Sequence, residues 1–211
     1  MRLPAAISRS CKQEKNKDVF LKNGPAIYHM NHPGNKIIYT IGHSTHSFAE
    51  LLEMLQSFEV RVLADIRRFP GSRKYPQFNK DNLAPALEKN GISYIHLEEL
   101  GGRRKVQTDS PNNRWKNASF RGYADYMETK EFATAIARLE AIALKQRTAC
   151  MCSEAVWWRC HRSMVSDYLK AKGWMVLHIM ATGKTTEHPY TSPARVVGDC
   201  VFYSDKNLFD Q

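Results

Sequence analysis

The most constraining feature of this sequence is a fivefold alternation between short apolar runs and amphipathic helical segments. The apolar runs are rich in β-branched residues and predict strands at residues 36–41, 61–66, 92–97, 148–153 and 174–180. The intervening segments predict helices at 47–58, 80–89 and 163–172, and one or two helices within 123–145. Strands that alternate with helices form βαβ units and lie parallel. We therefore expect an α/β fold: a three-layer Rossmann-like domain with a mostly parallel five-stranded sheet.

The predicted helix ends carry recognisable signals. Ser47 with Glu50 three residues later is typical of a capping box. Gly91 and Gly173 follow the predicted helices at 80–89 and 163–172, where a left-handed cap is expected. The mixed segment 183–211 contains one further candidate for an edge strand, at residues 199–203.

Two units are expected along the chain. Residues 1–35 are polar and lack periodicity, which predicts a disordered N-terminal extension, and residues 36–211 form a single α/β domain. No apolar run is long enough to span a bilayer, so no membrane partner is expected. The five cysteines are an odd number, and three of them crowd into residues 150–160, which indicates a reducing compartment. We expect a cytoplasmic protein and leave its oligomeric state open.

Positive charge is concentrated in short segments of this chain, whose formal net charge is +10. Residues 61–74 contain five basic side chains and one acidic one, and residues 103–121 contain six and one. Focused positive charge attracts phosphates and nucleic acid, although a solvated basic surface has the same composition. A phosphate-bearing ligand, including nucleic acid, is therefore the expected partner.

Reactive side chains follow four of the predicted strands. Because parallel strands expose their carboxyl ends at one edge of a sheet, we expect these groups to converge there on one site. The candidate catalytic residues are His43, Asp65, Cys152, Glu154, Cys160 and His161. The candidate phosphate-binding residues are Arg67, Arg73, Arg103, Arg159 and Arg162.

The same residues resemble the motifs of a known family. The motifs are Tyr39–Ser44 (YTIGHS), Asp65–Arg73 (DIRRFPGSR), Leu100–Gly102 (LGG), Cys152–Glu154 (CSE) and Cys160–Arg162 (CHR). In this order they resemble the domain-of-unknown-function 488 family over about residues 36–203. The resemblance implies a compact α/β domain and assigns no activity. Residues 1–35 have no counterpart in the family pattern.

The cysteines support three interpretations. A position near a helix N-terminus, beside Arg159 and Arg162, would favour the thiolate of Cys160, and Glu154 could accept a proton from His161. Alternatively, Cys150 and Cys152 are small core residues. A third interpretation is a zinc site with three ligands, Cys152, Cys160 and His161. His43 or His178 could supply the fourth ligand. The short paired spacing of structural zinc sites is absent, so we expect neither a metal nor a cofactor.

The remaining candidates also have two interpretations each. Asp65 ends a buried strand and needs a partner, so it is either a base or one half of an arginine salt bridge. His43 follows a glycine and is either an acid, base or phosphate contact, or a cap for the next helix. Trp157 and Trp158 could stack on bases or pack their loop over the sheet edge.

These patterns favour an enzyme, a hydrolase or transferase, that acts on a phosphate-bearing substrate such as a nucleotide or nucleic acid. A nucleic-acid-binding module without chemistry is the first alternative. A zinc-stabilised interaction domain is the second.

Overall fold

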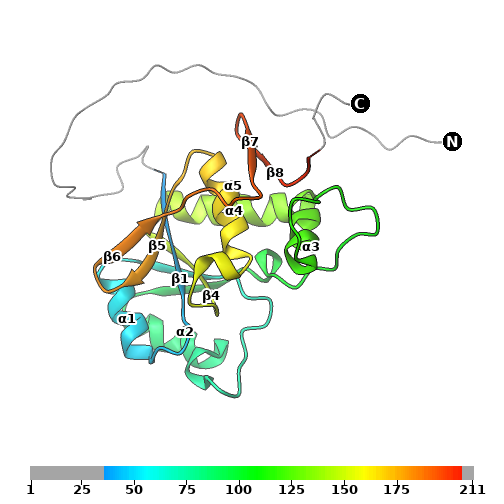
Figure 1. Ribbon diagram of the computed structural model, residues 1–211. Helices are drawn as coiled ribbons and strands as arrows, with labels where there is room; N and C mark the ends of the chain where they lie inside the picture. The colour runs from blue at the N-terminus through cyan, green and yellow to red at the C-terminus, as the bar shows by residue number, and fades with distance from the viewer. Residues whose placement is uncertain (1–35, 206–211) are drawn as a thin grey trace, which may run out of the picture.

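A six-stranded sheet forms the centre of the computed structural model, which describes residues 36–205 (Figure 1). The predicted extension, residues 1–35, lies outside the described residues. The strands are β1 (Ile37–Gly42), β2 (Val62–Asp65), β3 (Ser93–His96), β4 (Thr148–Cys152), β5 (Met175–Ala181) and β6 (Lys184–Glu187). Their order is β3-β2-β4-β1-β5-β6, and all neighbours are parallel except β5 and β6. The predicted α/β class and the five parallel strands are confirmed, with one antiparallel strand added.

Helices cover both faces of this sheet and give the molecule three layers (Figure 1). The helices are α1 (Phe48–Gln56), α2 (Lys80–Glu88), α3 (Ala118–Met127), α4 (Lys130–Lys145) and α5 (Arg162–Ala171). Short 3-10 turns are η1 (Pro76–Phe78), η2 (Glu98–Leu100) and η3 (Trp157–Arg159). One core cluster joins α1 and α2 to the sheet, and a second joins α3, α4 and α5 to its other face.

The strand order explains why the early helices and the later helices lie on opposite faces of the sheet. The chain moves outward from β1 to β2 and β3, and then returns through β4 to β5 on the far side of β1. Because βαβ crossovers are right-handed, this reversal places the later helices on the opposite face. The neighbours β1 and β4 therefore send their chains in opposite directions, which opens a crevice at their carboxyl ends.

Local sequence signals place several helix ends. The side-chain oxygen of Ser47 accepts from the Glu50 amide at 3.2 Å, and Glu50 accepts from the Ser47 amide at 2.6 Å, so the predicted capping box is confirmed. Gly91 and Gly173 have φ of 74° and 80°, the left-handed conformation that favours glycine. Thr129 caps α4 and separates it from α3.

Two predictions about the C-terminal part need correction. Residues 199–203 do not extend the main sheet, because β8 (Cys200–Phe202) pairs with β7 (Arg195–Val197) in a separate hairpin. The actual sixth strand, β6, was not predicted, because its four exposed residues have no apolar alternation. Among residues 36–205, no helix combines the length and the apolar character needed to cross a bilayer.

Candidate functional site

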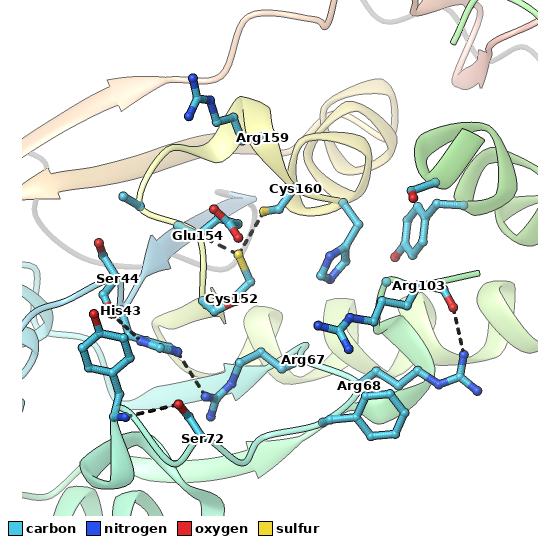
Figure 2. A pocket seen from close by; sticks show the side chains of 18 of the residues that line it. His43, Ser44, Arg67, Arg68, Ser72, Arg103, Cys152, Glu154, Arg159 and Cys160 are labelled. Carbon is cyan, nitrogen blue, oxygen red and sulfur yellow. Dashed lines mark hydrogen bonds between the residues drawn. The ribbon is translucent and has the colours of Figure 1, made fainter. Parts of the chain in front are cut away.

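A cavity of about 650 Å³ lies at the carboxyl edge of the sheet, where the loops after β1, β2, β3 and β4 meet. Its lining includes most of the predicted site residues: His43, Arg67, Arg103, Cys152, Glu154, Arg159, Cys160 and His161. Asp65, Arg73 and Arg162 are not part of the lining. The expected convergence of distant loops is therefore present, and Figure 2 shows the groups from the inside.

Asp65 and Arg67 form a buried ion pair beneath the cavity. The Arg67 guanidinium contacts the Asp65 carboxylate through Nη2 at 2.5 Å and through Nε at 2.9 Å. Nη2 also donates to the Phe78 carbonyl, and the Tyr94 hydroxyl donates to Asp65 at 2.6 Å. Of the two interpretations of Asp65, the salt bridge is the one present. Asp65 is fully buried, so it acts on the cavity by holding Arg67 at its wall.

His43 is neutral and bound at both ring nitrogens. Its Nδ1 lies 3.1 Å from the Ser44 carbonyl, and its Nε2 lies 3.2 Å from Nη1 of Arg67. Since Arg67 can only donate, Nε2 accepts and Nδ1 carries the proton. Burial and the charge of Arg67 lower the pKa of His43 to about 4. The ring stacks on Phe78, with 4.2 Å between centroids, and is held rigidly at the cavity wall.

Cys152 and Cys160 lie in contact within the cavity wall. Their sulfur atoms are 2.9 Å apart, and both thiols are free (Figure 2). The hydrogen bond from Cys160, together with the charge of Arg162, lowers the pKa of Cys152 to about 7 although burial opposes it. Burial raises the pKa of Cys160 well above its ordinary value. These opposite shifts favour Cys152 over Cys160 as the thiol that ionises first.

Cys150 confirms the alternative of a small core residue. It is fully buried in the core on the α5 side of the sheet. Burial raises the pKa of its thiol to about 12, which keeps it neutral. Two cysteines that are two residues apart on β4 thus differ in pKa, because only Cys152 has both a thiol donor and a cation as neighbours.

Arg162 supplies that cation from behind the cavity. It starts α5, and only 2% of its surface is exposed. Nη2 donates to the carbonyls of Glu154 and Ala155, while Nε and Nη1 have no hydrogen-bond partner. No carboxylate forms an ion pair with Arg162 among residues 36–205. A buried cation favours a nearby anion, so Arg162 stabilises the ionised form of Cys152.

His161 and Glu154 both line the cavity. Nε2 of His161 contacts the Ile66 carbonyl at 3.0 Å and not Glu154, so the expected contact between these two side chains is absent. Burial lowers the pKa of His161 to about 4. Nδ1 therefore presents a lone pair on the side of Gly102, where a Cβ atom would approach it to 2.8 Å. The Glu154 side chain is exposed and lines the cavity.

Three arginines of the cavity lining form no ion pair with a carboxylate among residues 36–205: Arg68, Arg103 and Arg159. Arg68 donates to the Arg103 carbonyl at 3.2 Å, which connects the loops after β2 and β3. Arg103 directs its guanidinium toward the middle of the cavity, whereas Arg159 points away from the two sulfur atoms (Figure 2). Arg73 is exposed and lies outside the cavity lining.

Glycines allow these loops to approach one another. A Cβ atom on Gly42 would lie 1.8 Å from the Glu154 carbonyl oxygen, and one on Gly101 would lie 2.7 Å from the Cα atom of Arg68. The close neighbour of Gly42 is therefore the loop after β4. The amides of His43 and Ser44 continue this contact by donating to the carbonyls of Cys152 and Ser153.

The ligand set of the zinc alternative does not assemble. Among residues 36–205, no group of three or more histidine, cysteine, aspartate or glutamate side chains is arranged to hold a metal ion. His161 is turned to Ile66, His43 to Arg67, and His178 to other partners.

Sequence reasoning missed a buried chain of hydrogen bonds behind β1 and β5. His178 contacts Thr40 at 2.6 Å and His188 at 2.9 Å, and His188 contacts Asp167 at 2.9 Å. The Trp157 ring stacks on His178, with 4.6 Å between centroids, so Trp157 packs its loop over the sheet edge. His178 and His188 are separated in sequence from their partners, and no spacing signal marks the set.

The fold and the site define an open α/β domain with a cavity of thiols and arginines at the carboxyl edge of its parallel strands. The chain belongs to the family described as domain of unknown function DUF488, whose family model matches residues 47–169. Comparison with curated proteins and with solved structures found no match.

Proposed function

We propose that this protein is an enzyme, a hydrolase or transferase, that binds a phosphate-bearing substrate in the cavity and uses Cys152 as its nucleophile. One observation carries the proposal: a thiol with a pKa of about 7 shares a single cavity with Arg68, Arg103 and Arg159, which form no ion pair with a carboxylate among residues 36–205. Glu154 is the one carboxylate in the described lining. The free thiols suit a reducing compartment, so we place this activity in the cytoplasm.

The side chains divide into groups that contact the substrate and groups that position others. Arg68 and Arg103 bind the phosphate, because their guanidinium groups offer paired N–H donors that no carboxylate occupies. His161 and Glu154 move protons during the reaction. The positioning residues act through others: Asp65 and His43 orient Arg67, Cys160 donates to Cys152, and Arg162 stabilises its thiolate.

Calorimetric titration with inorganic phosphate and ATP tests the binding step. We expect the double variant Arg68→Ala/Arg103→Ala to lose at least about tenfold in affinity, since charge-assisted hydrogen bonds contribute roughly 1.5–3 kcal/mol each. The matched control is Arg73→Ala, an exposed arginine of the same β2 loop that lies outside the cavity. Equal affinity in the double variant and the control, or no binding by the native protein, would contradict the proposal.

A second experiment tests the chemistry. Incubation with nucleotides or oligonucleotides, followed by phosphorus NMR, should detect a product with the native protein and none with Cys152→Ser. Binding should persist in this variant, because a hydroxyl replaces the thiol at similar size. Product formation by Cys152→Ser at the native rate would show that Cys152 is not the nucleophile.

Exposed aromatic rings favour the nucleic-acid-binding module as the second candidate. Phe69 is 62% exposed beside Arg68, and Trp158 is 51% exposed beside Arg159. Unpaired bases stack on such rings while arginines track the backbone. This candidate predicts that oligonucleotide affinity falls steeply with salt and that Cys152→Ser leaves all biological activity unchanged.

A further inference from the structure

The two cavity cysteines have the geometry of a reactive dithiol. Cys152 ends β4 and Cys160 follows the η3 turn, so the eight-residue spacing folds into a contact of 2.9 Å between sulfur atoms. A disulfide bond needs about 2.05 Å, so the sulfurs must close by roughly 1 Å. Both residues line an open cavity, with 2% of Cys152 and 9% of Cys160 exposed, so the cavity is the side from which a small disulfide would approach them.

The surroundings of the pair separate two roles. Cys152 has the nearby cation Arg162 and the hydrogen bond from Cys160, which together make it the attacking thiolate. Cys160 is protonated while Cys152 is charged, because the negative charge of Cys152 and burial both oppose its ionisation. Arg162 has no carboxylate partner, so its charge is available to whichever thiol is ionised.

We propose that Cys152 and Cys160 form a redox-active dithiol that low-molecular-mass disulfides oxidise to an intramolecular disulfide. In the first step the Cys152 thiolate attacks a sulfur atom of the disulfide RSSR, which breaks its S–S bond, forms a mixed disulfide on Cys152 and releases RS⁻. In the second step Cys160, after losing its proton to the released RS⁻, attacks Sγ of Cys152. This forms the Cys152–Cys160 bond and releases the second RS⁻, which takes up from the buffered solvent the proton that Cys152 gave up when it ionised. The protein loses two electrons and two protons, and RSSR becomes two RSH.

The order of the two steps follows from charge. Once Cys152 carries a mixed disulfide, it is uncharged and no longer accepts the hydrogen bond from the Cys160 thiol. Arg162 is then left without an anion, and its charge lowers the pKa of Cys160. The first step therefore activates the second thiol, which favours closure over accumulation of the mixed disulfide.

Oxidation also has a consequence for the loop between the cysteines. The disulfide ties the ends of residues 153–159, the segment that includes Trp157 and the exposed Trp158. It also consumes the Cys152 thiolate. The inference does not depend on the phosphate-binding proposal, because it needs only the two thiols and Arg162.

Treatment of the purified full chain with oxidised glutathione tests the inference by peptide mapping and mass spectrometry. We expect the native protein to lose the Cys152 and Cys160 thiols together, form the peptide linked between them and retain no glutathione at either site. Cys160→Ser should stop after the first step and retain one glutathione on Cys152. Cys150→Ser, which changes the neighbouring core thiol, should behave as the native protein.

The opposite results would overturn the inference. These are glutathione that persists on Cys152 in the native protein, a Cys160→Ser variant that gains no adduct on Cys152, or a linked peptide that joins other cysteines. Dithiothreitol should restore both thiols. Phosphate or ATP affinity of the reduced protein is measured separately, so failure of thiol exchange is distinguishable from failure of the proposed function.

Discussion

Replacing Cys160 with alanine should change the pH dependence of Cys152 in a characteristic way. In the native protein, the hydrogen bond from Cys160 is the largest contribution that lowers the Cys152 pKa from its ordinary 9.0 to about 7. The variant loses this donor, so the pKa should rise toward 9. The thiolate fraction at pH 7 would then fall from about one half to about one hundredth, roughly 50-fold.

Nucleophilicity partly offsets this loss. A thiolate of higher pKa attacks faster, with a Brønsted coefficient of about 0.4–0.5, so two pKa units correspond to roughly 6- to 10-fold. The net expectation is that alkylation of Cys152 slows by about 5- to 8-fold at pH 7 and accelerates by about 6- to 10-fold at pH 10. These are upper values, because Arg162 still stabilises the thiolate in the variant.

The assay is the rate of iodoacetamide labelling of Cys152 as a function of pH, followed by mass spectrometry of its peptide. Cys150→Ala is the matched control and should keep the midpoint near 7, since Cys150 has no hydrogen bond to Cys152. Rate curves for native protein and Cys160→Ala that never cross between pH 6 and 10 would refute the reasoning. So would a native midpoint close to 9.

Three further predictions concern stability and the cavity. Burial lowers the pKa of His43 and of His161 to about 4 each, and that of His178 to about 2. The histidines of the unfolded chain therefore bind protons first below pH 6.5, and urea denaturation should show a free energy of unfolding that falls by up to about 4 kcal/mol per pH unit from pH 6.5 toward pH 5; a flat profile over this range would contradict it. Gly42→Ala should disrupt the β4 loop, because its Cβ would lie 1.8 Å from the Glu154 carbonyl, whereas Gly71→Ala has open space; equal thermal midpoints would count against this contact. Asp65→Ala should cost about 3–5 kcal/mol in the free energy of unfolding, because it leaves Arg67 as an unpaired buried charge, and a loss below 1 kcal/mol by urea titration would argue against the buried pair.

The local elements were predictable because their signals are short-range. The β-branched run at 36–41, the capping box at Ser47 and the glycine after α2 each act within a few residues. The location of the site at the sheet edge was also predictable, because parallel strands end on one side. The sixth strand could not be predicted, because β6 is exposed and pairs only through its backbone with β5.

The individual roles within the site depended on long-range contacts. Sequence position put Cys160 near a helix N-terminus, and this favoured Cys160 as the thiolate. Burial and the contact with Cys152 oppose ionisation of Cys160, and both depend on how the loop folds back on β4. The partner of Asp65 could be inferred to be an arginine, but that Arg67 also holds His43 required their positions in space.

The sequence by itself therefore determined the α/β class, the order of strands and helices along the chain, and the gathering of reactive residues at one edge of the sheet. Hydrophobic periodicity and capping are local properties, and parallel connectivity converts them into a common edge. Only the tertiary structure decided which arginines are neutralised, which thiol is charged and which groups line the cavity. Charge and burial at a side chain are set by neighbours from distant segments, as with Arg162, whose effect on Cys152 has no sequence signature.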